Sequence, residues 1–376
     1  MIKTLKMYNV EFGDCFQLLG TDIDENYSLL VDFGSDSPKV KVAQIESSIR
    51  RTLNTYHPNA KVCGMITHIH EDHYSLFCNL PMHFFDIFYL PNFFSPSIIR
   101  MSLFTLIFTA RTSTVYAFAY ALLKMIPNLL SSKILRYNSQ IHFVQKGEKI
   151  IDDIDVLWPS PTLTTNSALD NIIENFEAII RTRDEYTSII ETVNKLQRQY
   201  FSLLGENHRI TQTDINMSTA TEILSTLNTL PNLSLGLGKK ETKTIRDIQN
   251  NCSIVISKPN SVLMLGDITA AICNKHIIPI VKNNQYKITK VSHHGTRPYF
   301  TKNLPASEYM LIPNGHRKRA IPISALYALT YRNSKFICSN ACKFCEVRAA
   351  GITCNSIKHK RGKKNRCNIK KWQIDL

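Results

Sequence analysis

Residues 67–73, Thr67-His68-Ile69-His70-Glu71-Asp72-His73, decide the fold class, because they place three histidines and two carboxylates within six residues. The apolar run Val62-Cys63-Gly64-Met65-Ile66 leads directly into them. A short apolar run of this kind indicates a buried strand, so the polar residues follow a strand end. Imidazole and carboxylate groups are the side chains with which proteins bind divalent metals. The stretch therefore predicts a metal site, and a histidine-rich surface loop is the alternative.

The spacing of these side chains suggests how one short loop can serve two metals. In an extended or tightly turned loop, His68 and His70 point to the same side, because side chains alternate along extended backbone. Asp72 and His73 then reach a second point close by. The pattern predicts two divalent ions, zinc or manganese.

Two later motifs have the same form, an apolar strand that ends in polar side chains. The run Val262–Leu265 is followed by Gly266 and Asp267, and glycine allows the sharp turn that would bring the carboxylate to the strand end. The stretch Lys290-Val291-Ser292-His293-His294-Gly295-Thr296 repeats the arrangement with paired histidines. A Gly-Asp pair alone is usually only a turn. In this order after residues 68–73, the motifs support one metal centre.

Composition agrees with a water-soluble enzyme. The chain has 376 residues, enough for one large domain or two, and 44% of them are hydrophobic. Glu11 and Asp14 interrupt the N-terminal segment, so it lacks the apolar core of a signal peptide. Ten cysteines without an export signal indicate a reducing compartment. We expect a cytoplasmic protein.

Charge and hydropathy bear on the partners. The net charge of +15 favours acidic partners, nucleic acid first and an anionic membrane surface second. The longest apolar segment, 101–130, contains Arg111 and Lys124. A membrane-spanning helix needs about 20 apolar residues with few charges. We therefore expect buried helix here and no stable membrane insertion, and the sequence identifies no protein partner.

Periodicity predicts a mixed α/β organisation. A helix is expected over 39–56, where Val42, Ile45, Ile49 and Leu53 form one stripe, and helical character recurs over 96–136. Residues 163–246 are polar with helical period, which suggests a helical insertion or lid. Strands are expected at 3–10, 15–19, 28–33, 84–91, 141–144, 154–158, 253–257, 262–265, 286–291 and 310–312.

The C-terminal region, residues 341–376, is expected to be a basic tail that contains cysteines. Residues 358–366 are strongly basic, and such a run is either a solvated tail or a nonspecific contact to a phosphate backbone. The spacing of the cysteines matches no standard zinc finger, so free thiols and a structural zinc site are both open. The residues concerned are Cys338, Cys342, Cys345, Cys354, Cys367 and His359.

Taken together, the motifs resemble the metallo-β-lactamase superfamily, and within it the hydrolase domain of ComEC-type competence proteins. The resemblance covers about residues 1–160 and 250–340 and leaves out the insertion and the tail. Its landmarks, in order, are Asn9–Cys15, Leu30–Gly34, His68–His73, Val156–Pro159, Asn251–Val255, Leu265–Asp267 and Ser292–Thr296.

The resemblance implies a four-layer αββα sandwich over residues 1–340, with the helical insertion at 163–246 and a dinuclear metal centre along one edge. It implies one metal on His68 and His70, and the other on Asp72 and His73. It makes Asp267 the bridging ligand. His294 would be the histidine of the final motif, with His293 or His316 as alternatives for that part. Asp32 would either orient a metal-binding histidine or cap a strand end.

One departure from the family pattern concerns the first metal. Many members place a further histidine on it, from a motif that precedes the bridging aspartate. This chain has Asn251 at the corresponding place. The departure favours one tight and one weak metal site.

The chemistry implied is hydrolysis by hydroxide that two metals activate, about 3.5–4 Å apart. Asp72 would accept a proton from the attacking water, and His293 would donate a hydrogen bond to substrate or leaving group. A phosphodiesterase or nuclease is the first expectation. A hydrolase of a small ester, and a nucleic-acid-binding or protein-binding module with a degenerate metal site, are the alternatives, because this fold hosts many chemistries.

Overall fold

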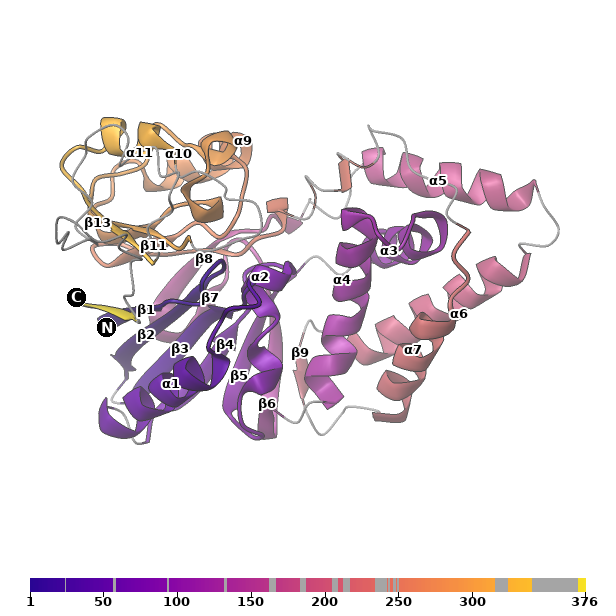
Figure 1. Ribbon diagram of the computed structural model, residues 1–376, viewed down its shortest axis with the longest axis horizontal. Helices are drawn as coiled ribbons and strands as arrows, with labels where there is room; N and C mark the ends of the chain where they lie inside the picture. Colours follow the sequence, from indigo (N-terminus) through magenta and orange to yellow (C-terminus); the bar gives the residue numbers. More distant parts are fainter. Residues whose placement is uncertain are drawn as a thin grey trace.

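The structure is a computed structural model. It describes residues 1–23, 25–56, 59–92, 95–131, 134–161, 167–182, 187–204, 209–211, 217–233, 242, 244–245, 248, 250–314, 324–339 and 371–376. Over these residues the chain is a mixed α/β protein built on two multi-stranded sheets (Figure 1). The expected α/β class is therefore confirmed.

In the described part of the chain, the first sheet has the strand order β15-β1-β2-β3-β4-β5-β6-β9. Its strands β3 to β6 are parallel, and they are largely apolar because both faces of this part of the sheet are covered. The bounds are β1 (Ile2–Tyr8), β2 (Cys15–Asp22), β3 (Glu25–Phe33), β4 (Lys61–Met65), β5 (Phe85–Pro91), β6 (Leu135–Val144), β9 (Arg209–Thr211) and β15 (Lys371–Asp375).

The second sheet, over the described residues, has the order β14-β13-β12-β11-β10-β8-β7. Strands β11 to β14 are parallel, so their carboxyl ends lie at one edge. The bounds are β7 (Lys149–Ile150), β8 (Ile154–Trp158), β10 (Val255–Lys258), β11 (Val262–Met264), β12 (Tyr286–Lys290), β13 (Ser307–Ile312) and β14 (Lys335–Cys338).

Three clusters of buried apolar side chains define the layers. One cluster joins the inner faces of the two sheets and includes Met65 of β4 and Ile256 of β10. A second lies on the outer face of the first sheet, under α1 (Val42–Tyr56), α3 (Pro96–Phe108), α4 (Thr114–Ser131), α5 (Ser167–Arg181), α6 (Thr187–Leu204) and α7 (Met217–Thr229). A third lies outside the second sheet, under α9 (Ala270–Ile272), α10 (Ile278–Val281) and α11 (Ala325–Thr330).

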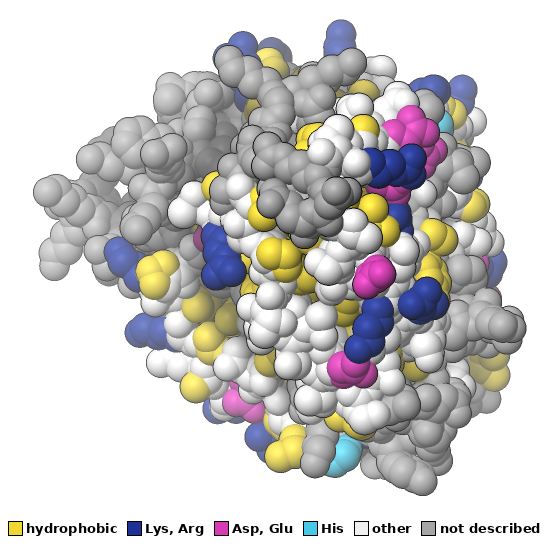
Figure 2. Space-filling model, turned by 90° about the vertical axis from the view of Figure 1, so that its right-hand side faces the viewer, with side chains coloured by type: hydrophobic (Ala, Val, Ile, Leu, Met, Phe, Trp, Pro, Cys, Tyr) yellow, Lys and Arg dark blue, Asp and Glu magenta, His cyan; other side chains and the backbone are white. Residues whose placement is uncertain are grey.

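Helices α3 to α7 form a lobe beside the first sheet, which we call the helical lobe (Figure 1). Arg100 of α3 ties it together, because its guanidinium donates to Glu177 at 2.7 Å and to Asn194 at 2.7 Å. Figure 2 shows the face of the molecule on this side, where the coloured charged side chains of both signs are scattered. The basic surplus of the chain is therefore not concentrated in the part of this face that is drawn in colour.

The long apolar segment forms two helices inside the protein rather than one long apolar helix. All residues of α3 from Ile98 to Phe108 except Arg100 are buried. Thr109 ends α3, and α4 begins at Thr114. None of the helices in the described ranges is both long and apolar enough to cross a membrane.

The helix expected over 39–56 is observed as α1, and Ile45, Ile49 and Leu53 of its stripe are buried. Among the features that were not expected are three strands. Strand β9 lies within the segment expected to be helical and pairs with β6. Strand β14 extends the second sheet. The last residues of the expected tail form β15, which pairs antiparallel with β1.

Candidate metal centre

The motif residues meet because the parallel strands of both sheets end at the same edge. The loop after β4 carries residues 68–73, the turn after β11 carries Asp267, and the turn after β12 carries His293 and His294. Ligand sites in parallel sheets form outside the carboxyl ends of the strands. The amide of Ile254 donates to the carbonyl of Thr67 at 2.8 Å and joins the two sheets here.

Two glycines allow the backbone to pack closely at this edge. A Cβ on Gly13 would lie 2.3 Å from the carbonyl oxygen of Gly34, and a Cβ on Gly34 would lie 2.3 Å from the amide nitrogen of His73. The amide of Asp14 donates to the carbonyl of Asp72 at 2.9 Å. The loop over 9–14 therefore packs against α2 (Glu71–Tyr74), and it brings the side chain of Asp14 into the site.

One group of side chains with metal-ligand geometry consists of His68, His73 and Asp267, all buried. Nε2 of His73 lies 3.4 Å from Oδ2 of Asp267, and Nε2 of His68 lies 3.9 Å from the same oxygen. Two imidazoles and a carboxylate form a donor set that suits zinc or manganese.

A second group consists of Asp14, His73 and His294, also buried, and shares His73 with the first. Nδ1 of His294 lies 3.3 Å from Oδ1 of Asp14, and Nε2 of His294 lies 2.9 Å from Oδ2 of Asp72. The two overlapping groups form one continuous cluster. The structure thus contains a buried cluster of side chains that could hold metal.

His70, Asp72 and His293, the other three expected residues, lie beside these groups. Nδ1 of His70 is 2.9 Å from Nε2 of His68. Nε2 of His293 is 3.9 Å from Oδ2 of Asp267. His293 is 22% exposed and Asp72 is 17% exposed, whereas His68, His73 and His294 are fully buried. The cluster is therefore reached from the side of His293 and Asp72.

The surroundings of His73 fit a metal ligand. Oδ2 of Asp32 lies 2.8 Å from Nδ1 of His73, and the same carboxylate accepts hydrogen bonds from the amide and hydroxyl of Thr67. This contact fixes the ring. Nε2 of His73 is buried and has no hydrogen-bond partner among the described residues. Because buried polar atoms are nearly always paired, this nitrogen between Asp267 and His68 is placed as a metal ligand would be.

The charge at the site also fits cations. Four buried or nearly buried carboxylates meet there, those of Asp14, Asp32, Asp72 and Asp267. The permanent positive charge among them comes from Lys290, whose Nζ lies 2.6 Å from Oδ2 of Asp14 and 3.1 Å from Oδ1 of Asp267. A buried excess of negative charge is costly unless it is neutralised. Divalent ions would neutralise it, and without them protons on His73 and His294 would do so in part.

The pKa values of the histidines reflect this charge. Burial lowers the pKa of His294, but Asp267, Asp14 and Asp72 outweigh that effect and raise it to about 10. Burial likewise lowers the pKa of His73, and the surrounding carboxylates raise it well above its ordinary value. Burial lowers the pKa of His68 well below its ordinary value, with His73 adding to the effect. His68 is therefore neutral, as a metal ligand must be.

Sequence reasoning missed two residues of this cluster, Asp14 and Lys290. Gly13-Asp14 repeats the Gly-Asp pair of residues 266–267, and both pairs place a buried carboxylate at the centre. That repetition was the signal that could have identified Asp14. Lys290 is the last residue of β12. The alternation of side chains along a strand does not show that its ammonium group reaches the carboxylates of Asp14 and Asp267.

Asn251, at the place of the missing histidine, has its side chain engaged elsewhere. Its side-chain oxygen accepts a hydrogen bond from the hydroxyl of Thr269 at 2.9 Å, and its carbonyl accepts one from the indole of Trp158. Cys338 is a buried cysteine on β14. His316, His359 and the expected cysteine sites at 342, 345, 354 and 367 lie outside the described residues, as does the basic run over 358–366.

No known protein family matches the chain, and no curated protein matches it. The assignment of a function therefore depends on the cluster itself.

Proposed function

We propose that the chain is a metal-dependent hydrolase of phosphodiester bonds, a nuclease in the first instance, with a metallo-β-lactamase-like fold. The observation that supports this proposal most is the pair of overlapping ligand groups centred on His73. Helices outside two facing sheets agree with the expected αββα layers. Two zinc or manganese ions held there would supply Lewis acidity and a water of lowered pKa.

The chain's own residues would divide the work as follows. His68, His73, Asp267, Asp14 and His294 would hold the ions, with His70 and Asp72 beside them. Asp32 keeps the ring of His73 in place. Lys290 neutralises part of the charge on Asp14 and Asp267, so both carboxylates can stay ionised and close together.

His293 is placed to act on the substrate. Four histidines contact Asp267, and His293 is the most exposed of them. Its ring stacks on that of Tyr299, with the ring centroids 3.9 Å apart. Its amide donates to Oδ1 of Asp267 at 3.2 Å. Burial lowers the pKa of His293 to about 4, so the neutral ring would donate a hydrogen bond to the substrate or leaving group rather than transfer a proton. Asp72, also partly exposed, would accept a proton or a hydrogen bond on the same side.

Nucleic acid is the proposed substrate because of charge. The net charge of +15 attracts polyanions, and phosphate neutralisation supplies most of the nonspecific affinity for them. Two adjacent cations are suited to in-line displacement at phosphorus, where both the attacking and the leaving oxygen carry charge.

Hydrolysis of a small ester is the second candidate, and Phe118 favours it. This buried residue of α4 contacts the ring of His70 with centroids 5.6 Å apart. An apolar side chain of the helical lobe therefore lies against the metal edge. A wall of this kind suits a substrate with an apolar group better than it suits a phosphate chain.

One experiment separates the candidates. The purified protein is incubated with labelled single-stranded and double-stranded DNA and RNA, with a chromogenic phosphodiester and with a chromogenic carboxylic ester. Each substrate is tested with manganese, with zinc and with chelator. We expect metal-dependent cleavage of nucleic acid and of the phosphodiester. Cleavage of the carboxylic ester alone would favour the second candidate, and no cleavage of any substrate would contradict both.

A further inference from the structure

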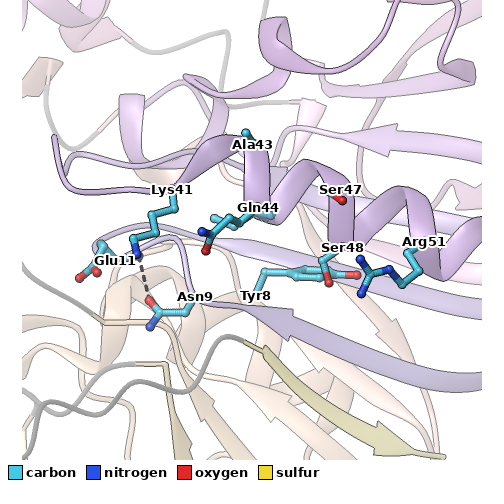
Figure 3. Close-up of a pocket in the computed structure, with 10 residues that line it drawn as sticks. Tyr8, Asn9, Glu11, Lys41, Ala43, Gln44, Ser47, Ser48 and Arg51 are labelled. Carbon is cyan, nitrogen blue, oxygen red and sulfur yellow. Dashed lines mark hydrogen bonds between the residues drawn. The ribbon is translucent and has the colours of Figure 1, made fainter.

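A cavity separate from the metal ligands lies between α1 and the end of β1 (Figure 3). Its volume is about 640 Å³. We call it the α1 pocket, and the residues of its lining that matter here are Tyr8, Asn9, Glu11, Lys41, Ser48 and Arg51. This volume is in the range of ligand sites for molecules of drug size.

The floor of the α1 pocket is rigid. Tyr8 is buried, and its hydroxyl donates to the side-chain oxygen of Gln17 at 2.5 Å. Gln17 in turn donates to Ser28 at 2.9 Å, and Lys6 donates to Thr52 of α1 at 3.0 Å. This buried polar network fixes α1 on the sheet. The cavity is therefore formed in advance and does not have to be opened by a ligand.

One end of the α1 pocket lies nearer the metal centre than the other. This follows from chain order, because α1 begins after the carboxyl end of β3 and leads back to the start of β4, which is parallel to β3. The Lys41 end of the pocket therefore lies at the edge that carries the site. Asn9 and Glu11, at the same end, belong to the loop that continues to Asp14. The Arg51 end points away along the sheet.

The spacing of the two cations suits an extended anion. Lys41 and Arg51 are ten residues apart, and a helix rises 1.5 Å per residue, so about 15 Å separates them along the axis. Each strand of duplex DNA carries a phosphate about every 3.4 Å of axis. The span therefore exceeds the spacing of neighbouring phosphates, so the two cations could contact different phosphates of one strand. Ser48 and other hydroxyl and amide groups lie between the cations.

Charge in the pocket is positive but not uniformly so. The lining has one carboxylate, that of Glu11, and it lies at the Lys41 end, away from Arg51 (Figure 3). The neighbouring Arg50 pairs with Glu46 at 3.3 Å, and neither belongs to the lining. Removal of Glu11 and removal of the two cations should therefore change the affinity for an anion in opposite directions.

We propose that the α1 pocket binds a single strand of nucleic acid through its phosphates, and that it leads the strand to the loop that carries Asp14. The inference rests on the proposed function, because it names a binding site for the substrate of that reaction. The rigid floor, the direction of α1 and the separation of the two cations carry it.

The test compares matched pairs of charge removals. The double variant Lys41→Gln/Arg51→Gln removes the pocket cations, and Lys39→Gln/Arg50→Gln removes two exposed cations of the same region that do not line the pocket. Binding of a labelled 20-nucleotide DNA or RNA strand is measured by fluorescence anisotropy in chelator, so no cleavage occurs. We expect the pocket variant to bind about tenfold more weakly, with a salt slope shallower by about 1.4, since each phosphate of a single strand contributes about 0.7.

In the control variant, the salt slope should change by less than half as much as in the pocket variant. The Glu11→Gln variant should bind the strand more tightly than the wild type. Equal losses in the two double variants, or no loss in either, would overturn the proposal. Turnover of the chromogenic phosphodiester with metal is measured in parallel. If that turnover persists while the pocket variant binds the strand as tightly as the control variant does, the pocket inference fails and the proposed function stands. If turnover is absent in the wild type, the proposed function fails, while the binding data still decide the pocket.

Discussion

The metal edge and the helical lobe are both buried, but they are buried in opposite ways. At the edge, four carboxylates, several histidines and Lys290 lie within hydrogen-bonding or ion-pair distance of one another. In the lobe, apolar side chains fill the space, as where Phe176 of α5 stacks on Phe108 of α3 with centroids 4.8 Å apart. The lobe is stabilised by apolar burial, whereas the edge concentrates buried charges that are offset only by Lys290 and by protonated histidines or a bound cation.

The contrast separates the region that stabilises the fold from the region proposed to bind metal and substrate. Buried like charges are costly, and perturbed titratable groups cluster at functional sites. A chain selected only for stability would gain from apolar residues at the edge. Substitutions at the edge should therefore remove metal and activity, and substitutions in the lobe should remove stability.

The largest effect is expected from Asp267→Asn. Its carboxylate contacts His68, His73 and Lys290, so loss of the charge weakens the first ligand group directly. Hydrolysis of the chromogenic phosphodiester should fall by two orders of magnitude or more, with the far-UV circular dichroism unchanged. Asp155→Asn, an exposed carboxylate on β8, is the matched control. Wild-type activity in the Asp267 variant would remove Asp267 from the centre.

A smaller effect is expected from Asp32→Asn, which contacts His73 but belongs to neither ligand group. Loss of a group that orients a metal-binding histidine typically lowers metal affinity about 10–100-fold. Competition with a chromogenic chelator measures that affinity. Asp86→Asn serves as control, because Asp86 also accepts a backbone amide at a strand, that of Val62, away from the centre. Equal affinity in wild type and the Asp32 variant would leave Asp32 with a purely structural role.

The dependence of stability on pH should differ between the metal-free and metal-loaded protein. Without metal, the pKa of His294 is about 10, above its ordinary value near 6.5. Protonated His294 then contributes stability fully below about pH 6.5, and this contribution is lost as the pH rises to about 10. Thermal unfolding in chelator should show Tm falling over this window more steeply in wild type than in His294→Gln. Metal loading should flatten the difference, since ligands bind metal deprotonated. Parallel slopes in chelator would contradict the charge arrangement.

The smallest effect on activity is expected from Phe176→Ala in the helical lobe. Truncation of a buried phenylalanine typically costs about 3–5 kcal/mol of unfolding free energy. Denaturant unfolding should register that loss, while metal content and phosphodiester turnover at low temperature stay at the wild-type level. Loss of metal in this variant would show that the lobe holds the edge in place and would blur the distinction between the two regions.

The two regions also differ in how far sequence predicts them. The residues of the candidate ligand groups follow strand ends, so local motifs pointed to His68, His73, Asp267 and His294, which the structure brings together. Asp14 was missed because its role depends on Gly13 and Gly34 packing the loop against α2, a contact between segments far apart in the chain. In the fold, α1 was predicted from its stripe. Strand β9 was not, because three residues carry too little periodicity and the pairing with β6 defines the strand. The pairing of β15 with β1 joins the two ends of the chain and leaves no local signal.

Metal content tests the central claim most directly. Wild type, His68→Ala/His70→Ala and the control His142→Ala/His276→Ala are loaded with zinc or manganese, desalted and subjected to elemental analysis. We predict up to two ions per chain in wild type and in the control, and the loss of at least one ion in the His68/His70 variant. Unchanged metal content in that variant, or a wild type that retains no metal, would contradict the account.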